Sequence, residues 1–65
     1  MNEATRIVRN AAVMPGFNTT TSVDVVNEIL DRFGDSTFCN GELRKLVFSK
    51  ITDKYYSFHT IPFDS

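Results

Sequence analysis

The amino-acid sequence predicts a mainly α-helical fold: three short helices and a C-terminal extended strand, in a helix-turn-helix-like order. The first observation behind this prediction is that apolar residues recur at helical spacing in three separate segments. The second is that the period changes to two in the aromatic segment YYSFHTI near the C-terminus. The chain of 65 residues predicts one small domain, 1–65, near the lower size limit for folding without disulfides or metals.

The first predicted helix runs from Ala4 to Met14. Its apolar residues are spaced three or four positions apart, as on one face of an amphipathic helix: Ala4, Ile7, Val8, Ala11 and Met14. Arg6 and Arg9 fall on the opposite side, which predicts that both guanidinium groups face solvent. Pro15 and Gly16 end the helix, because proline disfavours helical backbone in the residue before it and glycine turns easily.

The second predicted helix follows the segment FNTTTS, which is interpreted as a loop whose Thr21 or Ser22 caps the helix. Its apolar stripe is the clearest in the chain: Val23, Val26, Ile29, Leu30 and Phe33. Gly34 stands where a helix commonly ends in a left-handed residue. The exposed side of this helix carries mostly carboxylates: Asp24, Glu28 and Asp31.

The third predicted helix extends from Gly41 to about Lys50, after a connector with the sequence DSTFCN. Asn40 is a suitable N-cap, since its side-chain oxygen can accept a free backbone N–H of the first turn. The inward stripe of this helix would hold three apolar residues: Leu43, Leu46 and Val47. The segment TDK at 52–54 is typical of a turn.

The last predicted element is a strand over 55–61, ended by Pro62. A lone strand must pair with another extended segment, so we expect it to meet STFC in the connector or a second chain. The core predicted from all these stripes consists of Ile7, Val8, Ala11, Val26, Leu30, Phe33, Leu43, Leu46 and Val47.

The composition argues against an enzyme. Cys39 and His59 are the one notable nucleophile and base, and sequence spacing alone does not place them together. One Cys and one His are fewer ligands than a structural zinc site needs. The three glycines are isolated rather than grouped in a phosphate-binding loop. We therefore expect a protein with no catalytic residues, no cofactor and no metal.

The net charge counts against DNA binding, and the cysteine content together with the lack of a signal peptide or membrane span predicts a cytoplasmic protein. Seven Lys and Arg against eight Asp and Glu give a net charge of −1, whereas dedicated DNA-binding domains are usually basic. A single cysteine cannot form an internal disulfide, which fits a reducing compartment. No segment reaches the run of about 18 apolar residues that a membrane span requires, and the N-terminal stretch lacks the apolar run of a signal peptide.

Two functions from different classes fit this pattern. The favoured one is a non-enzymatic regulator that binds a larger protein stoichiometrically, as a monomer or homodimer, and blocks it sterically or electrostatically. Its predicted contacts are the exposed basic and aromatic residues Arg6, Arg9, Arg44, Lys45 and Tyr55. The alternative is a compact helix-turn-helix DNA-binding protein, dimeric, whose recognition helix would present Arg44, Lys45 and Lys50.

The stretches MNEATRIVRN and KITDKYYSFHTIPFDS, together with the chain's length and slight acidity, resemble in format the small early proteins of bacteriophages. Several members of that group bind host RNA polymerase and alter transcription initiation. The resemblance implies a regulator that acts in the host cytoplasm and inhibits bacterial transcription through RNA polymerase. It carries no motif, so it implies no site residues.

Overall fold

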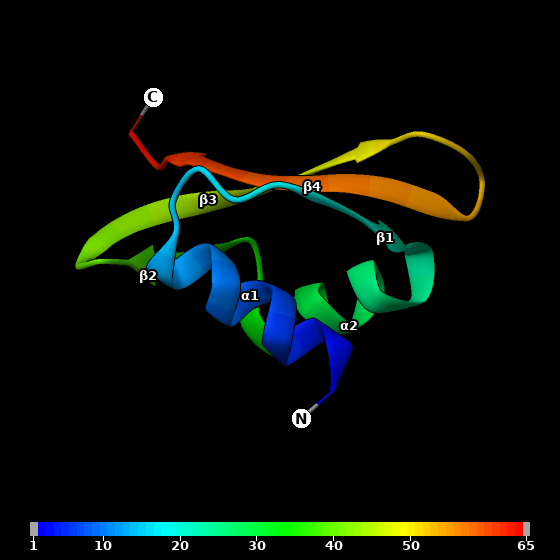
Figure 1. Ribbon diagram of the computed structural model, residues 1–65, viewed down its shortest axis with the longest axis horizontal. Helices are drawn as coiled ribbons and strands as arrows, with labels where there is room; N and C mark the ends of the chain where they lie inside the picture. Colours follow the sequence, from blue (N-terminus) through cyan, green and yellow to red (C-terminus); the bar gives the residue numbers. More distant parts are fainter. Residues whose placement is uncertain (1, 65) are drawn as a thin grey trace.

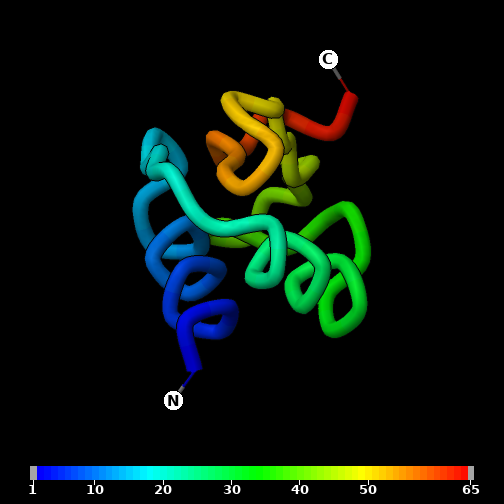
Figure 2. The backbone as a smooth tube through the Cα atoms, turned by 90° about the vertical axis from the view of Figure 1, so that its right-hand side faces the viewer, coloured from blue at the N-terminus to red at the C-terminus, as the bar shows by residue number. Residues whose placement is uncertain are grey.

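Each of the two helices is followed by strand, one after the first helix and three in succession after the second, and the strands form a single antiparallel sheet (Figure 1). The computed structural model describes residues 2–64. Within this range the elements are α1 (Glu3–Val13), β1 (Thr19–Ser22), α2 (Val23–Phe33), β2 (Ser36–Cys39), β3 (Glu42–Lys50) and β4 (Tyr55–Pro62). The sheet order is β1-β4-β3-β2, and α1 and α2 lie side by side on one of its faces (Figure 2). The fold is therefore α+β, and the prediction of a mainly α-helical fold is wrong.

Both N-terminal helices are confirmed, with their ends within one residue of those predicted. Asn2 caps α1, because its Oδ1 accepts the backbone N–H of Thr5 at 2.9 Å. The Asn2 amide also donates to Glu28 Oε2 at 2.8 Å, which links the start of α1 to α2. Ser22, one of the two predicted caps, caps α2: its hydroxyl accepts the Val25 N–H at 3.4 Å.

The third predicted helix is wrong, because residues 42–50 form the strand β3. The reason lies at the residue chosen as its cap. Asn40 and Gly41 both have positive φ, 52° and 83°, and they form the two-residue turn of a hairpin in which Cys39 pairs with Glu42. An Asn-Gly pair is a strong hairpin signal, since these residues adopt left-handed backbone at low cost. The helix-turn-helix arrangement disappears with this helix.

Two segments interpreted as irregular are strands. The predicted loop FNTTTS contains β1, and the predicted connector DSTFCN contains β2. The C-terminal strand is confirmed as β4, which pairs with two neighbours in the same chain. Phe58 lies opposite Thr19 of β1 on one side and Phe48 of β3 on the other. STFC is extended as expected, but it pairs with β3 and not with β4.

The core lies between the helices and one face of the sheet. It consists of Ala4, Ile7, Val8, Ala11, Ile29, Leu46 and Phe58. Phe58 is fully buried, and its ring stacks on that of half-buried Phe48 with 5.2 Å between the centroids.

Part of the predicted core is confirmed and part is wrong. The confirmed residues are Ile7, Val8, Ala11, Val26 and Leu46. Leu30 and Phe33 are exposed instead of buried. Leu43 and Val47 were placed in the core because they matched helical spacing with Leu46. In a strand, however, residues at odd offsets from Leu46 point to the opposite face of the sheet.

We predict that Gly41→Ala destabilises the protein by about 1–2 kcal/mol, because a Cβ is strained at a φ of 83° although no atom lies within 4 Å of it. Urea denaturation measures the change. Gly16→Ala is the matched control: its Cβ also meets open space, and no positive φ is involved, so the midpoint should stay nearly constant. Equal midpoints for the two variants would contradict this account of the turn.

Candidate protein-binding surface

The two faces of the sheet differ in what covers them. One face, here called the inner face, packs on the helices and includes buried Leu46, Phe58 and Thr60. Side chains alternate along each strand, so the residues between these positions point to the outer face. No helix among residues 2–64 covers the outer face, as the ribbon shows (Figure 1).

Apolar side chains gather at one end of the outer face. Phe38 of β2 lies opposite Leu43 of β3, and the Phe63 N–H donates to the Leu43 carbonyl at 3.2 Å, so these residues form a row across the strands. Their exposed fractions are 65% for Phe38, 37% for Leu43 and 44% for Phe63. Two half-buried apolar residues continue the surface: Ile61 lies in the next row, opposite Lys45, and Val47 lies one row further along β3, opposite His59. These five residues are the outer patch.

Lys45 lies within the outer patch. On β3 it is flanked by Leu43 and Val47, and it lies opposite Ile61 of β4 and Ser36 of β2. Among the outward-facing residues of the four strands, Lys45 is the only Lys, Arg, Asp or Glu. Its side chain is exposed, and no described carboxylate forms an ion pair with it.

The structure does not bring the predicted partner contacts together. Lys45 and Tyr55 share the outer face, with exposed Tyr55 at the end of β4 away from the outer patch. Arg6 and Arg9 are on α1, in the helical layer, where they line a shallow groove of about 290 Å³ with Asn10 and Val13. The predicted contacts on α1 and those on the outer face of the sheet therefore lie on two separate surfaces.

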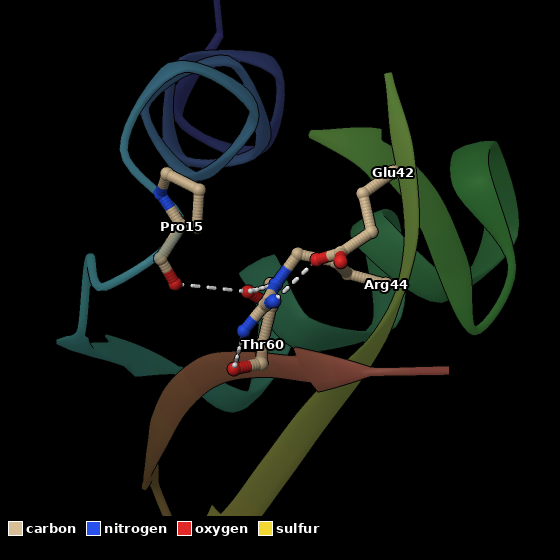
Figure 3. Close-up of polar contacts among 4 residues, drawn as sticks. All are labelled: Pro15, Glu42, Arg44 and Thr60. Atoms are coloured by element: carbon tan, nitrogen blue, oxygen red, sulfur yellow. Dashed lines mark hydrogen bonds and ion pairs between the residues drawn. The ribbon is translucent and has the colours of Figure 1, made fainter. Parts of the chain in front are cut away.

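Arg44 serves the fold, and its neighbours explain why (Figure 3). Its Nε donates to Thr60 Oγ1 at 2.9 Å and its Nη2 to the Thr60 carbonyl at 3.1 Å. Its Nη1 pairs with Glu42 at 2.7 Å, and the Thr60 hydroxyl donates to the Pro15 carbonyl at 3.2 Å. The Arg44 side chain is only 13% exposed. This network joins β3, β4 and the loop after α1.

The predicted DNA-reading set does not form one face. Arg44 points inward and Lys45 outward, because they are neighbours in a strand. Lys50 is an even number of residues from Leu46 and therefore lies on the inner side of β3. Its Nζ is 3.0 Å from Asp53 Oδ1 in the turn between β3 and β4. With no recognition helix at 41–50, these three residues cannot enter a groove in the way the sequence suggested.

Cys39 and His59 do not form a nucleophile–base pair. Cys39 is on β2 and buried on the inner side, whereas His59 is on β4 and points outward, with β3 between the two strands. Burial raises the pKa of the Cys39 thiol, opposed by the charge of Arg44 and reinforced by that of Glu42. A raised thiol pKa lowers the fraction of reactive thiolate.

His59 belongs instead to an open cleft of about 460 Å³ between β4 and the segment 15–20, where its neighbours include Asn18 and Ser57. The cleft exists because β1 pairs with β4 only as far as Phe58. Among residues 2–64, no group of three or more His, Cys, Asp or Glu is placed to hold a metal ion.

Sequence reasoning missed the outer patch. Its signal was the odd–even alternation of residues 43–49, which becomes visible only once Asn40-Gly41 is interpreted as a hairpin turn. Comparison with known protein families, curated proteins and solved structures finds no match to this chain. Over the described part of the chain, neither helix has the length and apolar character that crossing a membrane would require.

We predict that Arg44→Ala lowers the free energy of unfolding by about 1.5–3 kcal/mol, because it removes hydrogen bonds from a charged donor to the buried Thr60. Lys45→Ala, one residue away on the exposed face, should change stability by no more than about 0.5 kcal/mol. Thermal or urea unfolding compares the two. If Arg44→Ala proved as stable as Lys45→Ala, Arg44 would not have the structural role given above.

We predict that the Cys39 thiol of the native protein reacts with a colorimetric thiol reagent only slowly, because it is buried and its pKa is raised. After unfolding in guanidinium chloride the reaction should be fast. The measurement is the ratio of the two rates at the same mildly alkaline pH. Similar rates in both states would show that β2 does not shield this side chain.

Proposed function

We propose that this protein is a non-enzymatic regulator that binds a larger protein stoichiometrically through the outer face of its sheet. The observation that carries the proposal is the outer patch, where Phe38, Leu43 and Phe63 expose large apolar side chains in one continuous row. Exposed apolar groups that adjoin one another are typical of interaction sites, whereas scattered ones are ordinary.

The position of the outer patch on a sheet supports the same conclusion. Strands β2, β3 and β4 hold the backbone of four of its five residues through antiparallel pairing, and the N–H of the fifth, Phe63, bonds to the Leu43 carbonyl, so little backbone freedom is left to lose on binding. Phenylalanine side chains are enriched at the centres of protein interfaces, where they supply large apolar contact area. Of the partner contacts predicted from the sequence, Lys45 and Tyr55 remain candidates because both lie on the outer face. Arg44 is no longer a candidate, because its side chain is hydrogen-bonded to Thr60 within the fold.

The partner to test first is bacterial RNA polymerase, because the sequence resembles the format of small bacteriophage proteins that bind this enzyme. In that case the protein would inhibit transcription by occluding a surface that the polymerase needs. Occlusion requires only a stable complex of one copy with one enzyme, so it agrees with the separation of Cys39 from His59 on different strands and faces of the sheet.

We predict that Phe38→Ser weakens binding to RNA polymerase by about tenfold or more, because this residue is the most exposed of the outer patch. Val13→Ser is the matched control: Val13 is 66% exposed, against 65% for Phe38, but lies on α1 away from the outer patch. Binding is measured by titration of the labelled protein with nuclease-treated core enzyme.

Two results would count against the proposal. No binding to the enzyme by the unmodified protein would exclude this partner. Binding that Phe38→Ser leaves unchanged, while the variant remains folded, would exclude the outer patch as the surface.

A further inference from the structure

The starting observation is an unpaired cation inside an apolar surface. Lys45 stands between Leu43 and Val47 on β3 and opposite Ile61 on β4, so its ammonium group rises from the middle of the outer patch. Four other cations of the described chain have a carboxylate partner: Arg6, Arg32, Arg44 and Lys50. Lys45 has none among the described residues.

The carboxylates of the described chain are placed elsewhere. Glu42 points to the inner face and pairs with Arg44, and Asp53 is in the turn between β3 and β4. The others are on the helices or in the segments that flank β2 and β4: Glu3, Asp24, Glu28, Asp31, Asp35 and Asp64. The outer face therefore cannot neutralise Lys45 from within its own strands.

This arrangement limits what can cover the outer patch. A partner that excludes water from the five apolar side chains also removes water from around the Lys45 ammonium group. Burial of an unpaired charge is costly, whereas burial beside an opposite charge with good hydrogen bonds offsets much of that cost. A fitting partner must therefore bring an anion to a surface that is otherwise apolar.

We infer that the outer patch docks an acidic, apolar segment of the partner protein, with an Asp or Glu carboxylate placed on Lys45 and apolar side chains on either side of it. The inference rests on the proposed function and specifies the chemistry of its partner. The apolar neighbours of that carboxylate cover Phe38 and Leu43 on one side of Lys45 and Val47 on the other.

A second copy of this chain fits the outer patch poorly. A two-fold axis through the patch would bring two Lys45 side chains to the same interface, and the outer face offers no carboxylate to either of them. A nucleic acid also fits poorly. Its affinity depends on several phosphates being neutralised, and Lys45 is the single Lys or Arg among the outward-facing residues of the four strands.

Two short synthetic peptides test the inference directly. One alternates Leu with Glu, and the other has the same length with Lys in place of Glu. The readout is the change in amide NMR signals of Leu43, Val47 and Ile61 as each peptide is added. We expect the Glu peptide to shift these three signals and the Lys peptide to leave them unchanged.

The matched variants are Lys45→Met and Lys54→Met. Lys54 has no carboxylate partner among the described residues either, but it lies in the turn before β4, away from the outer patch. Lys45→Met should weaken binding of the Glu peptide by about ten- to hundredfold, because the peptide carboxylate loses its charged partner. Lys54→Met should change the affinity by less than about twofold, since an exposed charge of this kind contributes little.

The outcomes separate this inference from the proposed function. If both peptides bind equally, or if Lys45→Met binds the Glu peptide as well as the unmodified protein does, the ammonium group stays in water and the inference is wrong. The outer patch would still be the docking surface if Phe38→Ser weakens RNA polymerase binding. If neither peptide binds, the inference fails, and the polymerase titration with Phe38→Ser decides the proposed function by itself.

Discussion

The burial of Phe58 is the constraint on which the rest of the structure depends. This residue lies on β4, which pairs with both β1 and β3, and its side chain is fully enclosed between the sheet and the helices. Its ring stacks on Phe48, and it belongs to the same core cluster as the buried apolar residues of α1 and Ile29 of α2. A chain of this length buries a modest fraction of its surface, so one large aromatic residue at the junction of the elements contributes a large share of the core.

The need to bury Phe58 also determines which residues remain available for function. Because β4 alternates, placing Phe58 and Thr60 inward forces His59 and Ile61 outward. The register then brings Ile61 opposite Lys45 and His59 opposite Val47. The position of Lys45 among apolar side chains thus follows from the same pairing that fills the core. Arg44, next to it in sequence, is drawn inward to the Thr60 hydroxyl and carbonyl.

The two helices and the last strand could be predicted because their signals are local. The caps at Asn2 and Ser22, the glycine after Phe33 and the aromatic alternation in 55–62 act within a few residues of the structure they specify. Residues 42–50 could not be assigned to a helix or a strand from spacing alone. The positions of Leu43, Leu46 and Val47 fit a helix and a strand with apolar residues on both faces equally well. The Asn40-Gly41 turn decides between them. The outer patch was missed with this strand, because its members share a face only in a sheet.

The pairing of β1 with β4 has a consequence for folding during synthesis. The hairpins β2–β3 and β3–β4 join neighbouring segments, whereas the contact of Thr19 with Phe58 joins segments from opposite halves of the chain. Contacts between distant segments form late, because closing the long intervening chain costs conformational entropy that is offset only after the contact has formed. On the ribosome, α1 and α2 emerge before the strand that covers their apolar stripes. These stripes therefore stay exposed to chaperones and to other nascent chains until β4 has been made.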